Sequence, residues 1–333
     1  MTAPEIGAPR TRKSEFQPRV SVIIPAFNEE ETIAQVVADI RDHFAEVSEV
    51  LVIDDGSTDK TAERAAAAGA TVIRNPYNIG NGASVKRGCI AASGEILVML
   101  DADGQHPASE ISRLLEQIGS YDLCIGARTR RSTTSRVRNI GNAVLNSIAS
   151  WISESRVVDL TSGFRAMKRT VVLQYIHLFP RRYSYPTTTT MAFLLGNHFV
   201  KYVPVDSVTR RKFGKSNLRP VHDFFRFLNI MLRLLVLFRP QKFFLPLSLI
   251  TFVAGIIWAT YQLFNTGGLQ GTSLLLIISS VVFFCFGLLA EQIAEMRRQR
   301  SEDTVALVDL SGADKLTSSE TQQRQSRPNP ASK

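Results

Sequence analysis

Cysteine is scarce in this sequence. Only Cys89, Cys124 and Cys285 occur in 333 residues, far apart and each in apolar surroundings. An odd, dispersed set argues against a disulfide framework and against a zinc site, and it fits a reducing cytosolic compartment. The first 18 residues also lack an apolar segment, so we expect no signal peptide there and interpret residues 1–18 as a flexible polar tail.

Charged residues are missing from two long apolar runs, at about 243–264 and 272–290. Each run has roughly 20 residues, which is long enough to cross a bilayer as a helix. Their connector, NTGGLQG, is uncharged, whereas both outer flanks are basic: Arg233, Arg239 and Lys242 precede the first run, and Arg297, Arg298 and Arg300 follow the second. The positive-inside rule therefore predicts a multi-pass protein of the cell (inner) membrane with both termini in the cytoplasm. The alternative is a helical hairpin buried in a soluble protein.

The chain carries a formal net charge of +9, and 44% of its residues are hydrophobic. An excess of basic residues fits nucleic acid, anionic lipid or a phosphate-rich substrate. Because these residues cluster beside the apolar runs and in polar loops, we favour a membrane and a phosphate substrate and expect no nucleic-acid partner. The stretch 221–238 is rich in Phe and Leu but interrupted by Arg226 and Arg233, which predicts an amphipathic helix in the membrane interface.

Strand-like and helix-like segments alternate from Val20 onward. Apolar, β-branched runs predict strands at 20–24, 49–55, 71–74 and 95–100, and apolar residues at helical spacing predict helices at 30–44, 58–68 and 83–92. Such alternation predicts an α/β fold, a mostly parallel sheet with helices on both faces. The later pattern predicts a helix at 109–118, a strand at 121–128, a mobile loop at 129–138, helices at 139–152 and 171–178, a strand at 200–208 and a disordered stretch from about 301.

The segment LVMLDADGQHP, residues 97–107, passes from an apolar run into two carboxylates, Asp101 and Asp103, followed by Gln105. The apolar run predicts a buried strand, so these side chains should emerge together at its carboxyl end, where open α/β sheets bind ligands. Their oxygens suit Mg²⁺ or Mn²⁺. On spacing alone, the same residues could also form an acidic turn before a helix.

Two other predicted strands also end in polar residues, at 25–29 and at 54–57. Parallel strands end at one edge of a sheet, so all three polar segments should meet there. This is the arrangement that a nucleotide site requires.

Several motifs together resemble those of family 2 glycosyltransferases with the GT-A fold. They are SVIIPAFNEEETI, VIDDGSTDKT, NIGNGASVKRG, LDADGQHP, GAR and SGFRAMKR, spread over residues 20–218. More narrowly, the order resembles the branch of dolichol-phosphate mannosyltransferases and bacterial polyprenyl-phosphate glycosyltransferases, in which a membrane hairpin follows the domain. NIGNG alone is a poor cofactor signature, because it lacks the G-x-G-x-x-G spacing after the first strand.

The resemblance implies roles for residues at the motif positions. Pro25, Phe27 and Glu29 would line the nucleotide pocket, and Asp55 would hydrogen-bond the base. The divalent cation, Mg²⁺ or Mn²⁺, would be held by Asp101, Asp103 and Gln105. It would stabilise the charge that develops on the leaving pyrophosphate.

Four arginines are candidates for phosphate contacts, because a guanidinium donates two parallel hydrogen bonds. Arg128 and Arg211 sit at motif positions and are predicted to be catalytic, while Arg136 and Arg138 would help to bind the nucleotide. A lipid phosphate is already an anion, so it needs positioning rather than a strong general base. His106 is interpreted as shaping the start of a helix. The segment RRKFGKSNL departs from the family pattern at Lys215 and Asn217, so the resemblance does not assign acceptor contacts to these two residues.

The sequence therefore predicts a metal-dependent, inverting glycosyltransferase that moves a sugar from a UDP- or GDP-linked donor to a polyprenyl phosphate at the cytoplasmic membrane face. One alternative is a polysaccharide or glycerolipid acceptor; a processive synthase, however, would carry a Q-x-x-R-W-type motif and more spans. Another is a membrane-anchored protein that binds nucleotide sugar without turnover. A homo-oligomer is possible. The predicted segments are a tail (1–18), a GT-A domain (19–219), a juxtamembrane helix (220–242), two transmembrane helices (243–291) and a disordered cytoplasmic tail (292–333).

Overall fold

The computed structural model describes residues 18–325, except 45–46, 106–107, 129–135, 182–183, 206–219, 267 and 269–270. The chain forms two compact units. The first comprises Met1–Asn146 and Val157–Pro220, and the second comprises Ser147–Arg156 and Val221–Lys333.

The first unit contains a seven-stranded sheet in the order β3-β2-β1-β4-β6-β5-β7. Only β6 runs antiparallel to its neighbours, so the predicted mostly parallel α/β fold is confirmed. The strands are β1 (Val20–Ala26), β2 (Val47–Asp54), β3 (Thr71–Arg74), β4 (Ile96–Met99), β5 (Leu123–Arg128), β6 (Arg165–Lys168) and β7 (Val200–Val205).

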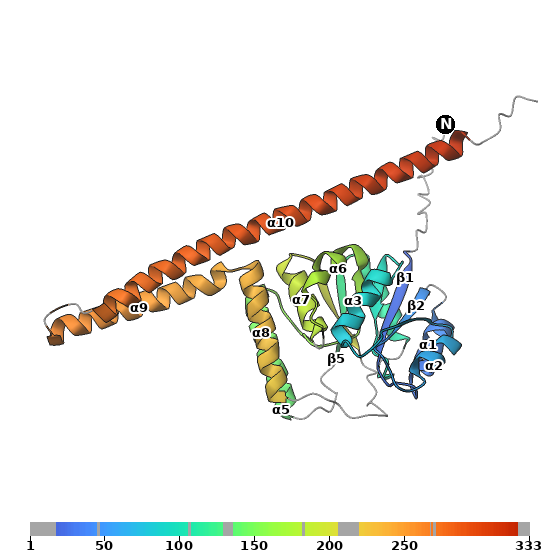
Figure 1. Ribbon diagram of the computed structural model, residues 1–333, viewed down its shortest axis with the longest axis horizontal. Helices are drawn as coiled ribbons and strands as arrows, with labels where there is room; N and C mark the ends of the chain where they lie inside the picture. Colours follow the sequence, from blue (N-terminus) through green and yellow to red (C-terminus); the bar gives the residue numbers. More distant parts are fainter. Residues whose placement is uncertain are drawn as a thin grey trace, which may run out of the picture. The chain divides into compact units, whose positions relative to one another are not determined.

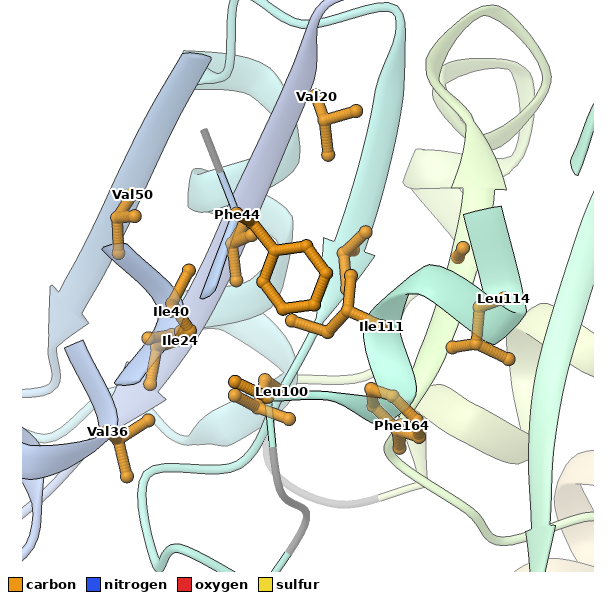
Figure 2. Packing of buried hydrophobic residues seen from close by; sticks show 14 of the residues in the cluster. Val20, Ile24, Val36, Ile40, Phe44, Val50, Leu100, Ile111, Leu114 and Phe164 are labelled. Atoms are coloured by element: carbon orange, nitrogen blue, oxygen red, sulfur yellow. The ribbon is translucent and has the colours of Figure 1, made fainter. Parts of the chain in front are cut away.

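Alternate residues of β1 face two separate cores. Val22 and Ile24 pack into a core with residues of α1, α2 and α4, whereas Ile23 packs into a second core with residues of α3, α6 and α7. Figure 2 shows part of the first core, where Ile24 lies near Val36 and Ile40 of α1. Because strand side chains alternate between faces, β1 must be apolar throughout, and the sheet is covered on both sides.

The helices of the first unit mostly lie where the apolar spacing predicts them. They are α1 (Ile33–His43), α2 (Thr61–Ala67), α3 (Asn81–Ala91), α4 (Glu110–Ile118), α6 (Arg169–Tyr175) with a 3₁₀ turn (Ile176–Leu178), α7 (Tyr185–Leu195), and α5 (Arg136–Ser153), whose end belongs to the second unit. One prediction is wrong: residues 136–138, placed in a mobile loop, form the first turn of α5. Val137, Ile140 and Val144 continue the helical spacing backward, and basic residues are good helix formers.

Three helices make up most of the second unit: α8 (Pro220–Phe238), α9 (Gln241–Thr266) and α10 (Gly271–Gln325). Segments Gln241–Asn265 of α9 and Gly271–Arg297 of α10 are long and apolar enough to cross a membrane, and most of each is exposed. Figure 1 shows α9 and α10 side by side. Small residues allow this close approach: a methyl group added at Gly255 would lie 2.9 Å from Ile277, and one added at Gly287 would lie 2.9 Å from Phe244.

Helix α10 continues to Gln325, so it differs from the disordered tail predicted for 292–333. A helix that has already formed adds one hydrogen bond for each further residue, which is far easier than starting a new one. The segment has no proline before Pro328, so nothing in it blocks this continuation.

Candidate active site

Three polar loops meet at one edge of the sheet, as the sequence predicts. Strand β1 lies between β2 and β4, with Ala26 opposite Asp54 and Ile23 opposite Met99. The amide of Asp55 donates to the carbonyl of Ala26 over 2.8 Å, which extends the β1–β2 pairing to the strand ends. The segments that follow β1, β2 and β4 therefore start side by side.

The loop after β1 is interlocked with the loop after β2. The amide of Asn28 donates to Oγ of Ser57 (3.0 Å), and the amide of Thr58 donates back to Oδ1 of Asn28 (2.9 Å). The amide of Glu29 donates to Oγ1 of Thr61 over 2.9 Å. These reciprocal bonds join the FNEE and GSTDKT motifs into one framework, and Asn28 accommodates it with a φ of 54°.

Asp59 lies inside this framework. Its carboxyl is partly desolvated, which opposes ionisation, but hydrogen bonds from Thr61 and from the amide of Glu30 outweigh that effect and hold its pKa below the usual value. Asp59 is therefore an anion that fastens the two loops at neutral pH.

Phe27 presents its ring at this edge and is 44% exposed, beside half-buried Pro25 and Glu29. Asp55, by contrast, is buried and already accepts three hydrogen bonds from the protein. They come from Nδ2 of Asn75 (2.9 Å) and from the amides of Ile79 (3.0 Å) and Gly80 (2.8 Å). Asp55 thus holds the loop before α3, a role that the sequence did not indicate; the predicted contact with a base stays a prediction.

Asp101 and Asp103 follow β4 in a tight turn. The amide of Gln105 donates to Oδ1 of Asp103 over 3.1 Å, and Gly104 between them has a φ of 67°. The hydroxyl of Thr32 donates to the carbonyl of Ala102 over 2.7 Å, so the loop after β1 supports this turn directly. We call residues 101–105 the DADGQ turn.

The carboxylate of Asp101 rests against Gly163, just before β6. A methyl group added at Gly163 would lie only 2.8 Å from Oδ2 of Asp101, so this close approach requires glycine. Tyr185 of α7 secures the position, because its hydroxyl donates to the carbonyl of Gly163 over 3.2 Å. Burial, reinforced by the charge of Asp101, raises the pKa of Tyr185 far above its usual value, so the hydroxyl keeps its proton.

Arg165 completes the support behind Asp101. It is fully buried, donates to the carbonyls of Ser162 and Pro186, and lies 5.7 Å from the centre of the Tyr185 ring. Gly163, Arg165 and Tyr185 were not predicted as site residues. For Gly163 and Arg165, the only signal in the sequence was their place in the SGFRAMKR motif. A charged residue such as Arg165 inside a short, largely apolar run requires buried partners.

The predicted phosphate-binding arginines are only partly placed. Arg128 ends β5, which runs parallel to β4, so its backbone lies at the same sheet edge as the DADGQ turn. The backbones of Arg136 and Arg138 belong to the first turn of α5. The side chains of these three arginines, and all of His106, Arg211, Lys215 and Asn217, lie outside the described residues.

The DADGQ turn offers oxygen ligands only, which suits Mg²⁺ or Mn²⁺. A methyl group on the Cα of Gly163 would fill the space that the Asp101 carboxylate occupies. Glycine at position 163 therefore keeps this carboxylate in the DADGQ turn, and the residues present fit a cation site. Among the residues that the structure describes, no group of three or more His, Cys, Asp or Glu side chains could hold a metal by itself. A cation here would therefore need further oxygen ligands, such as donor phosphates.

Comparison with known proteins agrees with this architecture. Residues 21–176 match the family described as glycosyl transferase family 2, and residues 239–296 match the GtrB C-terminal hairpin. Glycosyltransferase AglJ of Haloferax volcanii is 33% identical over 61% of this chain and 68% of its own. The undecaprenyl-phosphate 4-deoxy-4-formamido-L-arabinose transferase of Pectobacterium carotovorum is 27% identical over 72% of each chain.

A solved structure shares much of this fold. Glucosyl-3-phosphoglycerate synthase from Mycobacterium tuberculosis, in complex with Mn²⁺, UDP and phosphoglyceric acid, superimposes with a TM-score of 0.53 and 25% identity, covering 66% of this chain and 78% of that one. The GT-A fold predicted from the motifs is thus confirmed. The chain belongs to glycosyl transferase family 2 and is a glycosyltransferase.

Proposed function

We propose that this glycosyltransferase moves a sugar from a UDP- or GDP-linked donor to a polyprenyl phosphate, with inversion, at the cytoplasmic face of the membrane. The observation that carries the proposal is the combination of a family 2 domain with a GtrB C-terminal hairpin in one chain. A soluble acceptor would not require an apolar hairpin, whereas a lipid phosphate must be met at a bilayer. The relatives named as undecaprenyl-phosphate transferases support the same acceptor class.

The donor would bind across the three loops at the sheet edge. Phe27 offers an exposed ring for a base, and Asp55 keeps the loop before α3 in place beside it. Asp101, Asp103 and Gln105 would hold Mg²⁺ or Mn²⁺, which supplies positive charge to the leaving diphosphate. Thr32 and Gly163 fix the turn that carries these ligands, so little rearrangement is required when the donor arrives.

The acceptor phosphate is an anion at neutral pH and needs orientation and charge balance more than deprotonation. Arg128, Arg136, Arg138 and Arg211 are proposed to supply both. One opposite-charge contact at 4 Å contributes on the order of 4 kcal/mol at an effective dielectric constant of about 20. A few such contacts are therefore sufficient to offset the repulsion between the acceptor phosphate and the donor diphosphate.

We propose that the segments predicted from the sequence, from the GT-A domain to the end of the second apolar helix, are the functional domains of the protein. Residues 19–219 would form the catalytic domain, 220–242 a juxtamembrane helix and 243–291 a transmembrane hairpin, with both termini in the cytoplasm. The basic flanks of the hairpin support this orientation.

The test is a product assay in membranes that contain the protein. Labelled UDP- and GDP-sugars are incubated with undecaprenyl or dolichyl phosphate and Mg²⁺ or Mn²⁺, and lipid-linked sugar is identified by mass spectrometry. Asp103→Asn should abolish the product, whereas Asp42→Asn, an exposed carboxylate on α1, should leave it unchanged. If the labelled sugar is instead transferred to diacylglycerol or to a polysaccharide, the acceptor is not a polyprenyl phosphate. Donor binding without any product would count against the proposed acceptor class.

A further inference from the structure

The end of α5 is joined to the start of α9 within the second compact unit. Glu154 follows α5, and its Oε2 lies 2.8 Å from Nη1 of Arg239, while its Oε1 lies 2.5 Å from Nζ of Lys242. The ammonium group of Lys242 also donates to the carbonyls of Trp151 (3.5 Å) and Ile152 (3.3 Å). We call Trp151, Glu154, Arg239 and Lys242 the α5–α9 clasp.

Stability alone does not account for the clasp. Glu154 is 62% exposed, and exposed ion pairs each add little to the free energy of unfolding. Hydrogen bonds from Lys242 and Arg239 lower the pKa of Glu154, so the group carries its charge at neutral pH. What the clasp does achieve is positional, because it fixes Trp151 beside the first turn of α9.

Trp151 exposes a large aromatic surface: 62% of the residue is accessible. An indole ring with an apolar body and one N–H donor is suited to the headgroup layer of a bilayer, where one side is apolar and the other is wet. Lys242 is the second residue of the membrane-length segment Gln241–Asn265. Its direct contact with the Trp151 carbonyl therefore places Trp151 at the level where that segment begins.

The charges around Trp151 fit the same environment. Arg156, two residues after Glu154, is also exposed, so the clasp and its flank carry three cations, Arg156, Arg239 and Lys242, together with the carboxylate of Glu154. Cations are attracted to the negative surface of an anionic leaflet, and their aliphatic stems can lie along apolar surface. A surface that combines an exposed indole with surplus positive charge is complementary to anionic lipid headgroups.

Helix α8 of the same unit carries a surface of similar character. Phe225 is 63% exposed, Leu232 38% and Val236 37%, and Arg226 and Arg233 lie exposed beside them. Met231, Leu234 and Leu235 on the other side of α8 are buried. The helix thus has one buried face and one apolar, arginine-flanked face that is exposed among the described residues.

We propose that the α5–α9 clasp binds the headgroup layer of the bilayer, with the Trp151 indole inserted among anionic phospholipid headgroups. The membrane-bound surface then includes the end of α5 in addition to the predicted juxtamembrane helix and hairpin. This inference rests on the proposed membrane location of α9 and α10.

The chain contains two tryptophans, so each can be made the single reporter. In Trp258→Phe the remaining reporter is Trp151; in Trp151→Phe it is Trp258, which lies about 24 Å farther along α9 than Lys242 at 1.5 Å per residue. Both variants are reconstituted into vesicles of phosphatidylcholine and phosphatidylglycerol. Fluorescence is then measured with bromine atoms attached near the headgroup end or near the methyl end of the acyl chains. Subtracting the Trp151→Phe signal from that of the unmodified protein gives the Trp151 signal independently.

Trp151 should show a blue-shifted emission and lose more intensity to bromines near the headgroups than to bromines near the chain ends. The inference is overturned if Trp151 emits as it would in water and is unaffected by either lipid while Trp258 is quenched. If neither tryptophan is quenched, the hairpin is not in the bilayer, and the proposed membrane function fails together with the inference.

Discussion

The hydroxyl of Thr32 donates a 2.7 Å hydrogen bond to the carbonyl oxygen of Ala102, across 70 positions of sequence. Thr32 immediately precedes α1, and Ala102 lies between the two aspartates of the DADGQ turn. A carbonyl oxygen fixes the plane of its peptide unit, so this bond orients the peptide between Ala102 and Asp103 and the direction in which Asp103 leaves the backbone. The first loop of the domain therefore supports the candidate cation site through the backbone of the DADGQ turn.

Replacing Thr32 with valine should weaken cation binding while preserving the fold. The change keeps the side-chain shape and removes one hydrogen bond. The free energy of Mn²⁺ binding should become less favourable by about 1 kcal/mol, which is roughly a fivefold weaker affinity. Binding of Mn²⁺ in the presence of UDP can be followed by electron paramagnetic resonance or calorimetry. Thr32→Ser retains the hydroxyl and should recover most of the affinity.

Thr71→Val is the matched control, because Thr71 is exposed on β3. It should bind Mn²⁺ like the unmodified protein. Equal affinities for Thr32→Val and Thr71→Val would show that the Thr32 bond does not support the turn.

Gly163→Ala should reduce turnover by on the order of a hundredfold, because displacement of a reacting constellation by about 1 Å can have that effect. The added methyl group would lie 2.8 Å from Oδ2 of Asp101, and the carboxylate must move to accept it. Activity is measured as lipid-linked product, and far-ultraviolet circular dichroism reports whether the fold is retained.

Gly119→Ala serves as the control for adding a methyl group to this domain. Gly119 follows α4 with a helical φ of −60°, and nothing lies within 4 Å of the added carbon. This variant should retain full activity. A Gly163→Ala enzyme as active as Gly119→Ala would mean that the position of Asp101 is not critical.

Asp55→Asn should destabilise the domain and loosen the loop before α3. The asparagine amide would bring N–H donors toward the N–H groups of Asn75, Ile79 and Gly80, so at least one buried donor loses its acceptor. The expected loss is about 1–3 kcal/mol in the free energy of unfolding. Thermal unfolding in detergent measures it, and unchanged stability would contradict the role assigned to Asp55.

The sequence predicts the DADGQ turn well because a buried apolar strand that ends in carboxylates is a local pattern. The edge that it shares with the loops after β1 and β2 follows from the rule that parallel strands end together. Thr32 could not be assigned in this way. It falls inside the helix predicted at 30–44, and its bond to Ala102 depends on the relative positions of α1 and β4.

Local sequence patterns also failed to predict two elements in the second half of the domain, β6 and α7. Strand β6 has four residues and includes fully buried Arg165, a residue type that normally argues against a buried strand. Helix α7 contains four consecutive threonines, which favour strands by propensity. There the hydroxyls of Thr188, Thr189 and Thr190 bond to carbonyls four residues earlier, so tertiary burial overrides the propensity.

Asp122 should make the domain sensitive to acid. Its carboxylate lies 2.9 Å from Nζ of Lys168 and accepts the amide of Phe199 over 3.0 Å, at the start of β5. Burial alone would raise the pKa of Asp122, but the contacts with Lys168 and Phe199 outweigh burial and lower it below 3.8. Folding therefore favours the ionised form, and its contribution to stability is complete above pH 3.8 and is lost as the pH falls through the lower, folded-state pKa.

Thermal unfolding of the unmodified protein and of Asp122→Asn, measured across this pH range in detergent, tests the assignment. An asparagine side chain cannot ionise, so the variant should be less stable near neutral pH, and the difference between the two unfolding temperatures should narrow below pH 3.8. Asp42→Asn on the exposed surface of α1 should not show this convergence. A difference that stays constant with pH would mean that Asp122 stabilises the domain through its shape and hydrogen bonds rather than through its charge.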